Sequence, residues 1–335
     1  MLEFDDSRLD DASLLATRGD RLRHLALAGA RLRRAAGLAD VAALTRVAGD
    51  FRPRALIALG PEARFIRAVL EPTCPVPFVA WSRPGLPAWV GPLDLVVIVA
   101  GDPEAGDDSV HEALRRGAVV FSIGPEWGAL PEFAVDRSLA QVVTGTEDVF
   151  VNAVIALAGL ELLGLAPAPQ LARVADALDA VAEDCSPHIP LGQNPAKDTA
   201  VCLADTSPII WGGTVLAARA SRRLAEAIRQ VSHRAALAAD ATELLPVLAG
   251  AMPPDPFADP FLDPAPTPPY CLVLCDDASE DPRVQATRRD LESLAESRGV
   301  RVALVHYTVG APVERYACLL HHGLFAAAFL DLGLV

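Results

Sequence analysis

The sequence predicts an α/β protein with two parallel-sheet domains in tandem and helices on both faces of each sheet. Short apolar runs without polar alternation recur along the chain, as is typical of strands buried on both faces. Segments with helical periodicity separate these runs, and this rhythm indicates parallel strands joined by crossover helices. The length of 335 residues allows two domains of ordinary size, each with its own core.

The first half of the chain begins with helices and continues with five strands. We expect a helical segment over residues 1–50, with an amphipathic helix over 14–36 and a shorter helix over 41–48. A first α/β domain over 51–169 follows. Its predicted strands cover 55–59, 78–81, 93–100, 119–123 and 141–143, and its helices cover 62–70, 110–116 and 148–163.

The second half repeats this rhythm, so we expect a second α/β domain over residues 170–335. The predicted helices are 171–183, 195–203, 214–229, 284–298 and 313–330, and the strands are 208–211, 272–274 and 302–306. The last helix is apolar on most sides and should be buried. About half of the residues in 253–269 are proline, which excludes this segment from a helix or a sheet interior and predicts a stiff loop.

Charge and composition exclude several classes of partner. The formal net charge of −14 opposes binding to nucleic acid and to anionic membranes, although a local basic pocket can still hold a phosphorylated metabolite. The N-terminus is acidic, unlike a signal peptide. No CxxC pair occurs among the six cysteines, so we expect reduced core residues rather than disulfides or zinc ligands. These features predict a soluble cytoplasmic protein.

The segment 207–219 carries the first candidate site. An apolar strand ends at Gly212 and Gly213, and a helix begins after Thr214. Backbone amides can approach a ligand at such glycines, and open α/β sheets bind ligands where strands end. The alternative is a tight turn that needs glycine only for its backbone dihedrals.

Lys197 is the only lysine in the sequence, and it lies in the first turn of a helix that begins after Asn194. A cation in the first turn is poorly placed for the helix dipole, and an anionic ligand would offset that repulsion. The alternative is an ordinary exposed charge.

The helix after the double glycine carries charged residues at steps of three and four: Arg219, Arg222, Glu226, Arg229 and His233. Glu226 and His233 are the candidates for acid–base catalysis on an anionic sugar. A salt-linked face exposed to solvent is the alternative. The adjacent His321 and His322 point in different directions on a helix, so no metal site is predicted there.

Several of these segments resemble a known family. The tracts 194–197 and 207–214, with the Arg-rich helix that follows, resemble the C-terminal half of bifunctional phosphoglucose/phosphomannose isomerases, which are two-domain sugar isomerase (SIS) proteins. Residues 315–330 resemble their final helix. The segments 70–81 and 86–97 resemble the divergent TobH-type branch.

This resemblance implies two SIS-like (flavodoxin-like) domains, a homodimer, and interconversion of glucose or mannose 6-phosphate with fructose 6-phosphate, without a metal or an organic cofactor. Such a reaction needs a base, which would be Glu226 or His233. The residues implied to bind the sugar phosphate are Asn194, Lys197, Gly212, Gly213, Thr214 and Arg219.

The sequence also departs from the family at its expected sites. The loops at 60–64 and 100–104 carry carboxylates where the family has phosphate-binding Gly, Ser and Thr, and carboxylates repel a phosphate. The family's catalytic Glu and His fall near Val231 and Pro246. Three hypotheses stay open: an isomerase with relocated catalytic groups, a catalytically silent SIS protein that binds a sugar phosphate or regulates a partner, and a structural dimer.

Overall fold

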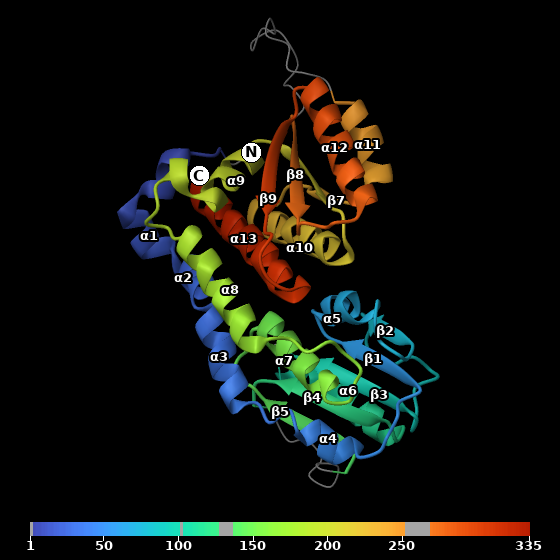
Figure 1. The fold of residues 1–335 in the computed structure, drawn as a ribbon. Helices are drawn as coiled ribbons and strands as arrows, with labels where there is room; N and C mark the ends of the chain where they lie inside the picture. Colours follow the sequence, from blue (N-terminus) through green and yellow to red (C-terminus); the bar gives the residue numbers. More distant parts are fainter. Residues whose placement is uncertain (1–2, 101–102, 127–136, 252–268) are drawn as a thin grey trace, which may run out of the picture. The chain divides into compact units, whose positions relative to one another are not determined.

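The computed structural model describes residues 3–100, 103–126, 137–251 and 269–335, except the side chains of 103–107 (Figure 1). The chain divides into two compact units, each with its own sheet. The first-sheet unit comprises Ala28–Ala175. The second-sheet unit comprises Met1–Leu27 together with Asp176–Val335.

Five parallel strands form the first sheet, in the order β2-β1-β3-β4-β5. They are β1 (Ala55–Leu59), β2 (Phe78–Trp81), β3 (Asp94–Val99), β4 (Val119–Gly124) and β5 (Leu139–Val143). The helices are α3 (Ala28–Leu38), α4 (Ala43–Ala48), α5 (Ala63–Leu70), α6 (Pro103–Arg115) and α7 (Val149–Glu161). β1 and β3 are buried along their whole length, as their uninterrupted apolar sequences require. All five predicted strands are confirmed.

Four parallel strands form the second sheet, in the order β7-β6-β8-β9. They are β6 (Ser207–Gly212), β7 (Leu237–Ala238), β8 (Tyr270–Asp276) and β9 (Arg301–His306). The helices after α8 (Leu171–Asp184) are α9 (Pro195–Leu203), α10 (Val215–Ser232), α11 (Ala241–Ala249), α12 (Pro282–Ser297) and α13 (Pro312–Gly333). The predicted fold class is confirmed, because both sheets are parallel and helices cover both sides.

The helix α13 is the central helix of the second-sheet unit. It packs against α9 and α10, and nearly all of its side chains are buried. Its length and composition would allow it to cross a membrane, but 89% of its apolar stretch is buried inside the protein. Burial of this kind is typical of the core helix of a soluble protein. The predicted buried closing helix is confirmed.

The amphipathic helix predicted over residues 14–36 is divided into three helices, α1 (Ala12–Arg18), α2 (Asp20–Ala26) and α3. The first break falls at Gly19, where a Cβ would lie 2.2 Å from the carbonyl oxygen of Leu15. Helical periodicity continues across this glycine in the sequence, so the break could not be read from the pattern.

The predicted N-terminal segment 1–50 is not a separate region, and this differs from the expected domain boundaries. Its first 27 residues belong to the second-sheet unit and the rest to the first-sheet unit. The physical reason is packing: α2 contacts α13, and Phe4 forms a β-bridge with Leu334. The amide of Asp5 also donates to the carbonyl of Gly333.

One strand and one α-helix of the second-sheet unit were not predicted. The strand β7 has only two residues, too few for a pattern, and α11 contains Pro246, which argues against a helix. The proline-rich loop predicted over 253–269 lies outside the described residues up to position 268.

Cys202 and Cys271 form a disulfide that joins α9 to β8. The expectation of reduced cysteines is therefore wrong for this pair. The two residues are 69 positions apart in the sequence, and only the fold brings their Cα atoms to 6.5 Å. The four other cysteines are free, and three of them are buried.

Candidate functional site

Each sheet has a topological switch point, where neighbouring strands send their connections in opposite directions. It lies between β1 and β3 in the first sheet and between β6 and β8 in the second. Open α/β sheets bind ligands outside the carboxyl ends of the strands at such points. The two switch points are therefore the first places to look for a site.

Gly212 and Gly213 lie at the second switch point, and close packing requires both. A Cβ on Gly212 would lie 2.2 Å from the backbone carbon of Ala217, and one on Gly213 would lie 2.3 Å from Cγ1 of Val284. Neither glycine has a positive φ, so the interpretation as a turn that needs special dihedrals is wrong. The glycines let α10 and α12 approach the end of β6. Their ligand-binding role stays a prediction.

A hydrogen bond between Thr214 and Asp277 lies at this second switch point. Oγ1 of Thr214 donates to Oδ2 of Asp277 at 2.6 Å and accepts from the amide of Ala217 at 3.0 Å. Asp277 follows β8 and is 6% exposed. Its carboxylate therefore stands beside the N-terminus of α10, where an anionic ligand would otherwise be attracted. The Thr214 hydroxyl, which was predicted to bind substrate, therefore already donates one hydrogen bond and accepts another within the protein.

Lys197 is fully buried, and the protein saturates its ammonium group. Nζ donates to Oδ1 of Asp10 at 2.6 Å and to the carbonyl oxygens of Pro187 and Ile189 at 2.9 and 2.8 Å. An ammonium carries three protons, and all three are used. The ring of Phe329 lies 5.3 Å from Nζ. The alternative of an exposed charge is wrong, and the predicted phosphate contact finds no free proton on Nζ.

Asn194 has a structural role as the N-cap of α9. Its Oδ1 accepts from the amides of Ala196 and Lys197, and its Nδ2 donates to the carbonyl of Ser186. An Asn cap followed by proline is a common way to begin a helix. The side chain of Asn194, which was predicted to bind substrate, therefore bonds the backbone at the start of α9 instead.

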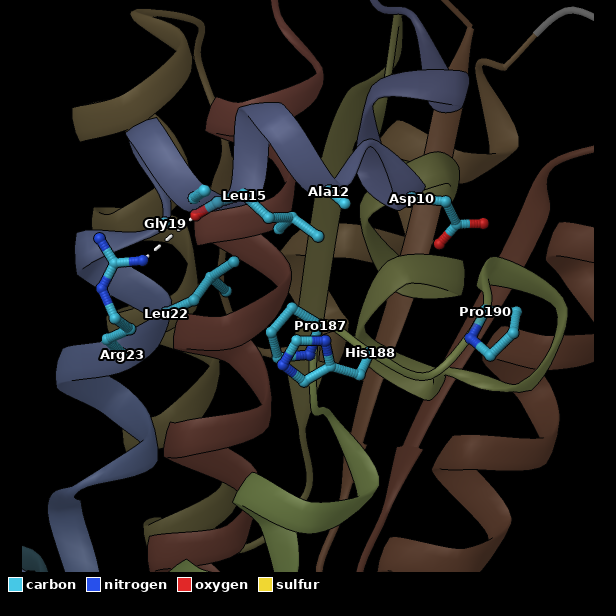
Figure 2. A pocket seen from close by; sticks show the side chains of 10 residues that line it. Asp10, Ala12, Leu15, Gly19, Leu22, Arg23, Pro187, His188 and Pro190 are labelled. Carbon is cyan, nitrogen blue, oxygen red and sulfur yellow. Dashed lines mark hydrogen bonds between the residues drawn. The ribbon is translucent and has the colours of Figure 1, made fainter.

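The exposed side of Asp10 faces a cavity of about 490 Å³ (Figure 2). The helices α1 and α2 form one side, and the loop that carries Pro187 and His188 forms another. Arg23 is the only arginine or lysine among the described lining residues, and it is bonded to Asp20 at 2.5 Å and to the carbonyl of Leu15 at 3.2 Å. This cavity therefore offers no free cation for a phosphate.

The structure does not bring Glu226 and His233 together. Glu226 bonds Arg223 at 2.8 Å and lies 3.6 Å from the guanidinium of the buried Arg219. His233 ends α10 with a φ of 56°, and its side chain is exposed. Seven positions separate the two residues, about 10 Å along the helix axis. The structure therefore excludes joint action of the two residues on one proton, and a role of either residue alone as the base stays a prediction.

A cluster that the sequence analysis missed lies at the carboxyl edge of the second sheet. Asp276 ends β8 and His306 ends β9, and Nδ1 of His306 lies 2.8 Å from Oδ2 of Asp276. The guanidinium of Arg288 on α12 bonds the same oxygen, and the amide of Ala278 donates to Oδ1 at 2.9 Å. A polar residue at the end of each of two predicted strands was the signal available in the sequence.

A second polar cluster is buried behind this edge. Tyr307 lies 3.1 Å from Nδ1 of His322, whose Nε2 lies 3.0 Å from the hydroxyl of Thr199. That hydroxyl donates in turn to the carbonyl of Pro195. Burial lowers the pKa of His322 to about 4 and raises the pKa of Tyr307. These contacts fit a neutral His322 imidazole whose Nδ1 accepts from the hydroxyl of Tyr307 and whose Nε2–H donates to the hydroxyl of Thr199. We therefore assign this buried hydrogen-bond network a structural role in the core.

Comparison with known proteins identifies the architecture. Residues 192–332 match the family model of the bacterial phospho-glucose isomerase C-terminal SIS domain. The structure of tagatose-6-phosphate ketose/aldose isomerase from Escherichia coli is similar with a TM-score of 0.65 at 15% identity, over 93% of this chain and 92% of that one. The chain has the SIS phosphosugar-isomerase fold.

Two further structures share this SIS fold. A glucose-6-phosphate isomerase like protein from Thermus thermophilus has a TM-score of 0.55 at 19% identity, over 97% of this chain and 92% of that one. The C-terminal domain of glucosamine-fructose-6-phosphate aminotransferase from Francisella tularensis has a TM-score of 0.58 at 13% identity, over 94% and 97% of the two chains. No curated protein matches the chain.

The first switch point of this SIS fold is flanked by the loop that follows β1. Gly60 has a φ of 106°, and a Cβ there would lie 1.9 Å from the carbonyl oxygen of Val99 at the end of β3. Glu62 is buried, whereas Arg64 in the first turn of α5 is exposed. The solvent side of this loop therefore carries a cation, and the repulsion of a phosphate by the buried carboxylate stays a prediction. The second predicted loop continues into residues 101–102, outside the described residues.

A buried hydrogen-bond network also lies at the end of β3, one of the two strands of the first switch point. Nδ2 of Asn152 on α7 donates to the carbonyl oxygen of Ala100 at 2.9 Å and to that of Thr146 at 3.0 Å. The hydroxyl of Thr144 lies 2.6 Å from Oδ1 of Asn152. These contacts link the ends of β3 and β5 to α7 through buried hydrogen bonds.

Proposed function

We propose that the chain binds a hexose 6-phosphate at the first switch point, and that Arg64 contacts the phosphate. The observation that carries this proposal is the exposed side chain of Arg64 in the first turn of α5, the helix that follows β1 at the first switch point. Among the side chains that the structure describes, none forms an ion pair with Arg64. A guanidinium suits a phosphate because two parallel N–H groups match two phosphate oxygens.

The similar proteins support a sugar phosphate as the ligand. The similar proteins include isomerases named for tagatose 6-phosphate and glucose 6-phosphate, and residues 192–332 match a phospho-glucose isomerase domain. We propose glucose, mannose or fructose 6-phosphate as the ligand, a cytoplasmic homodimer of the TobH-type branch as its binder, and no metal or organic cofactor. Aldose–ketose interconversion moves protons within the substrate and passes no electrons to a carrier, so it needs no redox cofactor, and a protein base can carry the proton.

Isomerase turnover at the carboxyl edge of the second sheet, as a site of the second-sheet unit by itself, is a second candidate function, and the His306–Asp276 pair favours it. With Nδ1–H donated to a carboxylate, Nε2 carries the lone pair that can accept a proton. The side chain of His306 is 43% exposed, so this nitrogen is accessible. Binding without turnover is favoured by the internal hydrogen bonds of Asn194, Lys197 and Thr214, which leave those side chains unavailable to a sugar.

Ligand binding is tested by thermal unfolding with each of the three hexose 6-phosphates. A ligand at 100 times its Kd stabilises the native state by about 2.7 kcal/mol, whether or not it is turned over. Arg64→Gln should weaken binding about 10- to 100-fold, since a charge-assisted contact contributes about 1.5–3 kcal/mol. Arg67→Gln is the matched control, because Arg67 lies on the same helix and is paired with Glu71. Glucose and inorganic phosphate control for the two halves of the ligand.

The outcomes separate the hypotheses. Absence of a shift with all three phosphates refutes the binding proposal, and an unaltered shift in Arg64→Gln refutes the role of Arg64. A coupled isomerase assay then distinguishes binding from turnover. His306→Asn keeps a donor towards Asp276 and removes Nε2, so it should abolish any turnover while leaving the thermal shift in place.

A further inference from the structure

We propose that Lys197 is a cryptic acylation site, whose amine becomes available only when residues 6–18 move away from it. These residues form the short 3-10 helix η1 (Asp6–Asp10) and α1, and together they are the cover segment. Once Lys197 is acylated, the cover segment can no longer close. The site lies within the second-sheet unit and is independent of the sugar-phosphate site.

The first observation is that the chain has one lysine amine and that the folded protein hides it. Lys197 is the single lysine among 335 residues, and it is completely buried. Its three ammonium protons are donated to Asp10 and to the carbonyl oxygens of Pro187 and Ile189. A reagent that attacks lysine side chains therefore finds no target while this arrangement is closed.

The second observation is that only a thin layer separates this amine from open space. Asp10 accepts from Nζ of Lys197 through Oδ1, and its own side chain is half-exposed. Asp10 and Pro187, which both bond Nζ, also line the cavity of about 490 Å³, together with His188 and Pro190 (Figure 2). A reagent that enters the cavity would therefore meet the amine as soon as Asp10 moves away.

The third observation is that the cover segment is weakly held. Leu9 is its only buried residue, and α1 has none. Segments with few buried apolar contacts open at a lower free energy than the rest of a fold. The helices η1 and α1 have five and seven residues, too few to stay helical once detached. Local opening of the cover segment, rather than unfolding of the whole unit, is therefore the route to Lys197.

Acylation in the open form is ordinary amine chemistry. The ammonium of Lys197 first loses a proton to water, and the free amine attacks the carbonyl carbon of an activated acyl donor. The bond from nitrogen to that carbon forms, and the bond from the carbon to the leaving group breaks. A second proton then leaves the nitrogen, so the product is a neutral secondary amide.

This product does not fit the closed arrangement. A secondary amide has one N–H group, whereas the closed form presents three acceptors, so two of them would lose their donor. Buried acceptors without a donor are unfavourable. The acyl group also adds volume where the lysine side chain is already completely buried. The acylated chain therefore keeps the cover segment open.

Acetylation of the full chain with N-hydroxysuccinimidyl acetate tests the proposal, with Lys197 followed by peptide mass spectrometry. The reaction should be at least about 100-fold slower in native buffer than in urea, because its rate is reduced to the population of the open form. Asp10→Ala should accelerate it roughly 3- to 5-fold in native buffer, since one contact that keeps the segment closed is lost. Asp6→Ala is the matched control: it removes an exposed carboxylate from the same segment and should leave the rate unchanged.

Hydrogen exchange then tests whether acylation holds the segment open. Protein acetylated in urea and returned to native buffer should lose the protection of amides 6–18 and retain that of α13. The control is protein acetylated while folded and then passed through urea, in which terminal amines react and Lys197 does not.

Four results would overturn the proposal. The first is modification of Lys197 as fast in native buffer as in urea, and the second is an Asp10→Ala variant that reacts no faster than Asp6→Ala. The third is full protection of amides 6–18 in the acetylated protein. The fourth is loss of protection in α13 as well, which would mean that the whole unit unfolds instead of the cover segment alone.

Discussion

Replacement of Lys197 by methionine is expected to destabilise the second-sheet unit rather than to remove a ligand contact. Methionine retains an unbranched apolar side chain of similar length and lacks the ammonium group. Lys197 is completely buried, and its Nζ joins Asp10, from the N-terminal segment, to two carbonyl oxygens of the loop before α9. The substitution therefore removes the link between two segments that are far apart in the sequence.

The size of the effect follows from the three acceptors. Loss of one partner from a buried ion pair costs about 3–5 kcal/mol when the remaining charge stays buried. Asp10 is 47% exposed and regains water, so its contribution is small. The carbonyls of Pro187 and Ile189 lose a charged donor, at about 1–2 kcal/mol each. We expect a loss of about 3 kcal/mol, which is a change of roughly a hundredfold in the unfolding equilibrium.

Urea unfolding followed by fluorescence measures this loss as a lower midpoint with an unchanged slope. The double variant with Asp10→Ala should show a small coupling energy, about 0.5–1 kcal/mol, between the two positions. A Lys197→Met protein that is as stable as the parent but no longer binds hexose 6-phosphates would refute this reasoning. That result would return Lys197 to the ligand site.

Three further predictions follow from buried groups. The second-sheet unit should lose about 3 kcal/mol between pH 6.5 and pH 4, because the folded pKa of His322 is lowered to about 4 and only the unfolded chain takes up a proton in this range. Urea midpoints at pH 7, 5.5 and 4 measure the loss, which His322→Gln should reduce; an equal slope in that variant contradicts the assignment. Gly213→Ala should cost about 1–3 kcal/mol through its clash with Val284, and Val284→Ala should restore part of the urea midpoint, whereas additive losses would exclude the clash. Asn152→Ala should cost about 2–4 kcal/mol in the thermal unfolding of the first-sheet unit, because it leaves two buried carbonyls without a donor, and a loss below about 0.5 kcal/mol would show that water replaces the amide.

The strands and most helices could be predicted because burial on both faces of a parallel sheet is a local demand. β1 and β3 must be apolar at every position, and α13 must be apolar on most sides, whatever lies next to them. The errors came where packing overrides a local pattern. Gly19 interrupts a continuous helical periodicity, and Pro246 is tolerated inside α11.

The candidate site was harder to predict because its meaning depends on partners that are distant in the sequence. The signal at Asn194 and Lys197 was real, but it marks a helix cap and a buried ion pair with Asp10, which is 187 positions away. Thr214 was correctly placed at a strand end, yet Asp277 already occupies its hydroxyl. His306 and Asp276 belong to different strands, and only the parallel register brings them into contact.

The sequence by itself determined the α/β class, the tandem sheets, the buried last helix and the SIS resemblance, since apolar periodicity and local capping signals are written in neighbouring residues. Only the tertiary structure decided which polar groups remain available: Lys197 and Thr214 are consumed inside the protein, while Arg64 is exposed at a switch point. The physical reason is that the partner of a polar side chain is chosen by the folded arrangement of distant segments, and no local pattern records that choice.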